Sequence, residues 1–137
     1  MASFDRIRQV LRDGPPLRVA ILFGSRARGA PRHDSDYDLA ILPVDPELPL
    51  SQETLLAATL EQAAGAPFDV VRLDRAVPAL RWRIARDGIV LLSHPPHAAP
   101  RFLAREAIEH DELSSLEVEA ARRYRARLAS THPSSTP

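Results

Sequence analysis

The chain has 137 residues, and its 18 basic and 18 acidic side chains cancel to a formal net charge of zero. A neutral chain of this length predicts one domain without an extended nucleic-acid surface. The lack of cysteine excludes disulfides and thiolate metal sites. No apolar run approaches the ~20 residues that span a bilayer, and the first residues show no signal-peptide pattern, so we expect a cytoplasmic protein without a membrane partner.

The first half of the chain alternates helical and strand patterns. Apolar residues at helical spacing predict a helix over residues 3–13, which Gly14 ends. Uninterrupted apolar runs predict buried strands over residues 17–23 and 37–42. A second helix is expected over residues 51–64.

The second half of the sheet region follows the same alternation. The sequence predicts a strand over residues 68–73, a helix over 77–87 and a short buried strand over 89–92. Strands that alternate with helices are typical of an α/β fold. We therefore expect a small mixed β-sheet with helices chiefly on one face.

Composition divides the chain into four segments. We expect the sheet domain over residues 1–93, a Pro-rich connector over 94–100, a C-terminal helical extension over 101–129 and a disordered tail over 130–137. The extension is one long helix or two shorter ones. An apolar stripe runs along it and fits packing on its own domain as well as packing on a partner; its members are Leu113, Leu116, Ala120, Tyr124 and Leu128.

Two aspartates begin the second predicted strand. Asp36 and Asp38 are two positions apart, and residues at that spacing in a strand point to the same face. Like charges this close repel each other, so a fold keeps such a pair mainly when a cation lies between them. Mg²⁺ is typically bound by one or two carboxylates together with substrate phosphates. The pair therefore predicts a metal site.

A small-residue turn separates the first two predicted strands. Gly24 lets the backbone approach a ligand closely, and a helix that opens after Ser25 would point free N–H groups at an anion. Arg26 and Arg28 add positive charge. An anion-binding turn beside a carboxylate pair predicts a site for a metal–nucleotide complex.

A third carboxylate is expected on a neighbouring strand, because two-metal phosphoryl chemistry needs a group that activates the incoming hydroxyl. Asp69 is the stronger candidate, since it lies inside an apolar run where a charge is costly unless a metal or partner stabilises it. Asp74 is the rival, but it lies beyond the predicted strand end.

These motifs carry a family resemblance. Gly24-Ser25, ten further residues and then Asp36-x-Asp38 resemble the signature of the DNA polymerase β-like nucleotidyltransferases. The more detailed sequence is similar to the minimal nucleotidyltransferase (MNT) branch, since it reads Gly-Ser-Arg-Ala-Arg-Gly followed by Ser-Asp-Tyr-Asp-Leu-Ala. Many members of that branch are antitoxins paired with HEPN-domain toxins. The resemblance is strong over residues 17–93, which makes residues 1–93 the expected nucleotidyltransferase domain.

The resemblance implies a reaction, ligands and partners. The reaction is Mg²⁺-dependent transfer of AMP from ATP to a hydroxyl, with a tyrosine of the HEPN toxin as acceptor and the toxin as partner in a hetero-oligomer. Two Mg²⁺ ions would be held by the catalytic residues Asp36, Asp38 and Asp69. The residues expected to bind the nucleotide are Gly24, Ser25, Arg26 and Arg28.

Two other functions stay open at this point. An aminoglycoside-type nucleotidyltransferase would use similar chemistry, but it expects an extra helical domain, and only residues 101–137 follow the connector. A non-catalytic antitoxin would inhibit its partner by occlusion, and a complete set of three carboxylates argues against this without excluding it.

Overall fold

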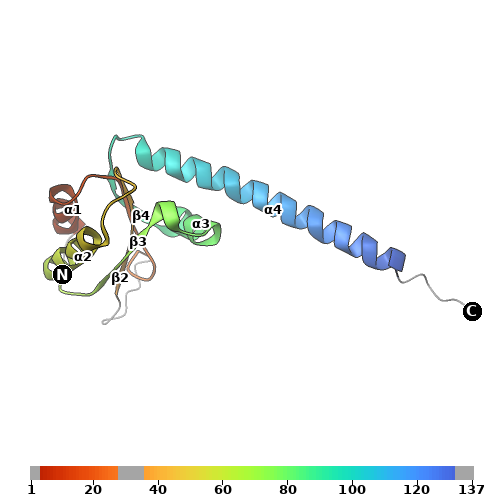
Figure 1. Cartoon of the computed structure of the whole chain (residues 1–137), viewed down its shortest axis with the longest axis horizontal. Coiled ribbons are helices and arrows are strands. Elements are labelled where there is room, and N and C mark those ends of the chain that lie inside the picture. The colour runs from red at the N-terminus through yellow and green to blue at the C-terminus, as the bar shows by residue number, and fades with distance from the viewer. Residues whose placement is uncertain (1–3, 28–35, 132–137) are drawn as a thin grey trace, which may run out of the picture.

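The computed structural model describes residues 4–27 and 36–131. Its centre is a mixed four-stranded sheet in the order β3-β2-β1-β4, which confirms the predicted sheet (Figure 1). β1 pairs antiparallel with β2 and β4, whereas β2 and β3 are parallel. The strands are β1 (Leu17–Phe23), β2 (Tyr37–Pro43), β3 (Phe68–Arg72) and β4 (Ile89–Ser93).

The helices lie between the strands and at the two ends of the described chain. α2 is the crossover that the parallel pair β2 and β3 requires, because parallel strands cannot be joined by a tight turn. The bounds are α1 (Phe4–Asp13), α2 (Leu50–Ala64), the 3₁₀ turn η1 (Leu73–Arg75), α3 (Pro78–Asp87) and α4 (Ala98–Thr131).

Both faces of the sheet are covered, so the expectation of helices chiefly on one face is wrong. α1 and α2 pack on one face through residues such as Ile7 and Leu60, while α3 and the start of α4 pack on the other through Ile84 and Ala99 (Figure 1). The physical reason is that β1 is apolar on both sides: from Val19 to Phe23, successive residues alternate between the two clusters.

α4 is a single helix and begins earlier than the predicted boundary at residue 101. Its first residue is Ala98, so the stretch predicted as a connector over 94–100 contributes its last three residues to the helix. The Ser93 hydroxyl accepts the Ala99 N–H at 2.9 Å and so satisfies one of the free donors at the helix start. The helix continues to Thr131, two residues into the segment expected to be disordered, and residues 132–137 lie outside the described part.

No helix within the described ranges combines the length and the apolar character that a bilayer crossing requires.

Candidate active site

The strand pairing brings two of the predicted carboxylates together. Asp38 and Asp69 are direct Cα partners in the parallel pair β2–β3. The residues just before them, Tyr37 and Phe68, point to the α1/α2 face, where their rings stack with centroids 4.6 Å apart. Because side chains alternate along a strand, Asp38 and Asp69 both point to the face that α3 covers. Asp36 precedes β2 by one residue and is exposed.

Gly24 places the turn after β1 directly against Asp38. Phe23, the last residue of β1, is the Cα partner of Asp38. Gly24 has φ +77°, and a Cβ atom at this position would collide with the Asp38 carboxylate. Only glycine therefore satisfies both the left-handed backbone and the close approach. The Ala27 N–H donates to the Gly24 carbonyl at 3.2 Å and closes a turn over residues 24–27.

Asp38 is partly buried and lies near three other charged side chains. Partial burial is the main cause that raises the pKa of its carboxyl above the ordinary value of 3.8, and repulsion by Asp69 and Asp36 raises that pKa further. Arg83 on α3 opposes the shift, since its positive charge stabilises the Asp38 carboxylate. Sequence patterns did not single out Arg83, because the uneven apolar spacing in its helix does not tell which side faces the sheet.

The carboxylates suit a divalent cation by chemistry and by charge. Carboxylate oxygens are the donors that Mg²⁺ prefers, and a cation would relieve the mutual repulsion of Asp36, Asp38 and Asp69. Across residues 4–27 and 36–131, however, no three His, Cys, Asp or Glu side chains are grouped closely enough to hold a metal ion. The structure thus brings these residues to one region without arranging them as a finished metal cluster.

Asp74, the rival third carboxylate, is engaged elsewhere. Its Oδ2 lies 2.6 Å from Nη2 of Arg72, which is only 7% exposed. The hydrogen bond from Arg72 is the largest cause that lowers the Asp74 pKa. Arg72 also contacts Glu53 of α2 at 3.2 Å. Asp74 therefore belongs to an ion pair that fastens β3 to α2, and not to the carboxylate site.

The remaining predicted residues have different positions. Ser25 follows Gly24 in the turn and is partly buried. The Arg26 guanidinium lies over the Tyr37 ring, 4.3 Å from its centroid, beside a side chain that points away from the carboxylate face. Arg28 lies outside the described residues. The nucleotide-binding roles of Gly24, Ser25, Arg26 and Arg28 stay predictions.

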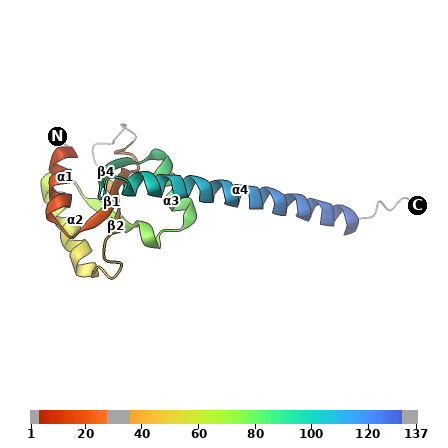
Figure 2. The ribbon, with the colours of Figure 1, turned by 90° about the horizontal axis from the view of Figure 1, so that it is seen from above.

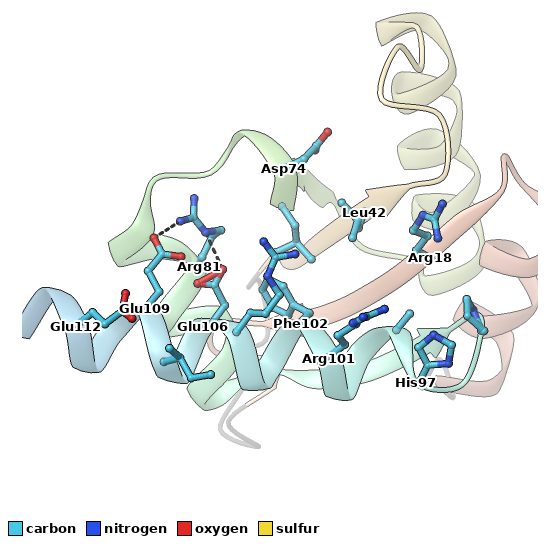
Figure 3. Close-up of a pocket in the computed structure, with 15 residues that line it drawn as sticks. Arg18, Leu42, Asp74, Arg81, His97, Arg101, Phe102, Glu106, Glu109 and Glu112 are labelled. Carbon is cyan, nitrogen blue, oxygen red and sulfur yellow. Dashed lines mark hydrogen bonds and ion pairs between the residues drawn. The ribbon is translucent and has the colours of Figure 1, made fainter.

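A cavity of about 1030 Å³ is lined by residues of β1, β2, α3 and α4 (Figure 3), and none of Asp36, Asp38 and Asp69 is among its lining residues. Its lining includes Arg18 at the start of β1 and Leu42 near the end of β2, so it opens at the strand ends opposite to Gly24 and Asp38. Arg101 and Phe102 of α4 form another part of its wall. This cavity and the predicted chemistry are therefore at different ends of the sheet.

The raised pKa of Asp38 predicts a pH-dependent gain in stability for Asp38→Asn. The folded chain binds the Asp38 proton more readily than the unfolded chain does, so the stability from this group falls as pH rises through the window above 3.8. Without metal, we expect Asp38→Asn to melt above the wild type at pH 7 and to lose this advantage as pH falls toward 3.8. Thermal melts across pH test this. The exposed Asp111→Asn is the control, and a lower melting temperature for Asp38→Asn at pH 7 would contradict the raised pKa of Asp38.

Comparison with known proteins identifies the family. A model of the family described as "Polymerase beta, Nucleotidyltransferase" matches residues 5–97. The protein adenylyltransferase MntA of Aphanizomenon flos-aquae (strain 2012/KM1/D3) is 31% identical over 113 residues, which are 75% of this chain and 75% of the relative.

Solved structures agree with this match. A chain in a crystal structure of a toxin-antitoxin with AMP-PNP superposes with a TM-score of 0.72 at 25% identity, covering 89% of this chain and 98% of that chain. A chain in a rebuilt structure of the tri-AMPylated Shewanella oneidensis HEPN toxin with its MNT antitoxin gives 0.65 at 24% identity, over 88% and 94%. At that identity the second likeness shows the fold alone. Because the family model covers most of the chain and the relative is 31% identical over 75% of it, this chain belongs to the polymerase beta nucleotidyltransferase family.

Proposed function

We propose that this chain transfers AMP from ATP to a tyrosine hydroxyl of a HEPN-type toxin in the cytoplasm, and so acts as the antitoxin of the pair. The observation that carries the proposal is the register of β2 and β3, which makes Asp38 and Asp69 neighbours on one face with Gly24 against them. The 31% identical relative is a protein adenylyltransferase, and the 25% identical structure is a toxin-antitoxin with an ATP analogue.

Each carboxylate has a distinct role in the proposal. Asp36 and Asp38 would hold the Mg²⁺ that accompanies the triphosphate, and Asp38 and Asp69 would hold a second ion. Bound Mg²⁺ supplies neutralisation of phosphate charge and lowers the pKa of the attacking hydroxyl. Asp69 accepts the proton of that hydroxyl. The tyrosine oxygen then bonds to the α-phosphorus, the bond from that phosphorus to the β-phosphate bridge breaks, and pyrophosphate leaves.

In this arrangement the phosphates lie between two elements, which are α3 and the turn that follows β1. The backbone N–H groups near Gly24 and the Ser25 hydroxyl donate to phosphate oxygens. Arg83, which already stabilises the Asp38 carboxylate from α3, adds positive charge close to the reacting phosphate. Arg26 would have to leave the Tyr37 ring to reach the phosphates.

A protein acceptor fits the exposure of the site better than a small molecule does. Asp36 and Asp69 are both exposed, so an acceptor side chain can reach them from outside the domain. The cavity of about 1030 Å³, which is large enough for a small-molecule acceptor, has none of the three carboxylates in its lining. The aminoglycoside-type alternative would need its acceptor pocket beside the carboxylates.

Transfer of label from ATP tests the proposal. With ATP labelled at the α-phosphate, the wild-type chain should label a cognate HEPN toxin, and an excess of chelator should abolish the labelling because the carboxylates need Mg²⁺. If the wild-type chain binds and neutralises the toxin without labelling it, the chain inhibits the toxin by occlusion and not by catalysis.

A further inference from the structure

The first half of α4 is fixed to its own domain. Arg81 of α3 pairs with Glu106 at 2.8 Å and with Glu109 at 2.7 Å, and Glu106 is only 6% exposed (Figure 3). Trp82 of α3 stacks on His110 of α4 with centroids 4.0 Å apart. These contacts place one face of α4, up to about residue 110, against α3.

The second half of α4 leaves the domain. Both views show it extending away from the sheet and from α3 (Figures 1 and 2). At 1.5 Å per residue its 34 residues make a helix about 51 Å long. Its large apolar side chains are exposed: Leu113 by 40%, Leu116 by 65%, Tyr124 by 62% and Leu128 by 39%.

The exposed residues continue the face that packs on α3. Leu113 lines a groove of about 490 Å³ between α3 and α4, together with Trp82 and His110. From there the apolar positions recur at steps of three and four, which keeps them on one side of the helix. We call this surface the α4 stripe; its residues are Leu113, Leu116, Ala120, Tyr124 and Leu128.

A stripe of this kind requires a partner. In proteins, a helix gains most of its stability from packing an apolar face against other parts of the structure. Contiguous apolar surface of this sort on a protein marks an interaction site. Within the described part of the chain, α4 contacts α3, β1 and β4, and all of these lie at its first half.

We propose that the α4 stripe, starting from the α3–α4 groove, is the surface on which the toxin docks. This rests on the proposed function for the identity of the partner. The crystallised toxin-antitoxin chain aligns over 89% of this chain and 98% of its own length. Residues 98–137 are more than a quarter of this chain, so that alignment includes part of α4. The same helix is therefore present in a relative that was solved with its toxin.

A stripe variant and an off-stripe control test the docking surface. The double variant Leu116→Ser/Tyr124→Ser removes two stripe residues, and Val118→Ser removes one apolar residue that is 69% exposed but lies off the stripe. We expect the double variant to bind the toxin at least about 100-fold more weakly, since buried aromatic and apolar anchors cost about tenfold or more each. Val118→Ser should change the affinity less than about twofold. Calorimetry without nucleotide measures both.

The outcomes separate docking from catalysis. Because all three side chains are exposed, the melting temperatures should match the wild type; a large fall in the double variant would assign the stripe to the chain's own core and overturn the proposal. Equal toxin affinity in the two variants would also overturn it. Light scattering of the chain alone measures its oligomeric state. A dimeric wild type and a monomeric double variant would show that a second copy of this chain, and not the toxin, covers the stripe. If the double variant loses toxin binding and the wild type does not label the toxin, the proposed function is wrong and the docking surface is confirmed.

Discussion

Asp69→Asn is expected to lower AMP transfer to the toxin by at least about 100-fold, because it keeps the shape of the side chain but removes the proposed acceptor of the hydroxyl proton. Affinity for ATP should fall only modestly, since Asp36 and Asp38 can still hold the ion that accompanies the triphosphate. Asp36→Asn should weaken both nucleotide binding and transfer. Single-turnover labelling with α-labelled ATP, run beside a toxin pull-down, measures the two effects separately.

Asp74→Asn is the matched control for this prediction. It neutralises the rival carboxylate, which pairs with the buried Arg72. Loss of a buried ion-pair partner should lower stability by about 1–3 kcal/mol, while transfer per folded molecule should stay near the wild-type value. The reverse result, full labelling by Asp69→Asn and none by folded Asp74→Asn, would show that Asp74 is the third catalytic carboxylate.

Gly24→Ala is expected to abolish the stabilisation of the chain by ATP with Mg²⁺. The new methyl group would meet the Asp38 carboxylate, so either the carboxylate or the turn has to move out of position. The backbone at φ +77° adds a strain of about 1–2 kcal/mol. The wild type should melt at a higher temperature with ATP and Mg²⁺, because a ligand that binds only the folded state stabilises it. The variant should show no such rise.

Gly65→Ala separates strain from collision. Gly65 ends α2 at φ +72°, nearly the same backbone conformation, but a Cβ atom there would have nothing within 4 Å. This variant should have a lower melting temperature than the wild type, because its backbone carries a strain of similar size. ATP with Mg²⁺ should still raise its melting temperature as much as that of the wild type. If Gly24→Ala behaves like Gly65→Ala in both measurements, the contact between Gly24 and Asp38 has no part in nucleotide binding.

The strands and the face of the carboxylates were predictable because both depend on short-range patterns. The strand predicted over residues 17–23 coincides with β1, and the strand that begins with Tyr37 extends only one residue further than predicted. The separation of Asp38 from Tyr37 onto opposite faces follows from the alternation of a strand. Asp69 was predicted as the third carboxylate on a neighbouring strand, but its direct pairing with Asp38 was not, since no local pattern fixes the register of two parallel strands.

Features that depend on tertiary packing were not predictable in the same way. The sequence did not indicate that helices would cover β1 from both sides, because an apolar run is consistent with several helix arrangements. Arg83 acts on Asp38 only through the placement of α3 on the sheet. The first turn of α4 was hidden by the prolines before it, although proline is well tolerated in the first turn of a helix, where Pro100 lies.

The strand order also determines when the site can form during synthesis. Asp38 and Asp69 become neighbours only after α2 has crossed over to place β3 beside β2. β1 gains its second neighbour last, when β4 pairs with it across the length of the domain. Pairings between distant segments form slowly, because the chain loses loop entropy before the contacts are made. A growing chain that ends before β3 therefore carries Asp36 and Asp38 without Asp69, and under the proposed function it could transfer AMP only when nearly the whole sheet has left the ribosome.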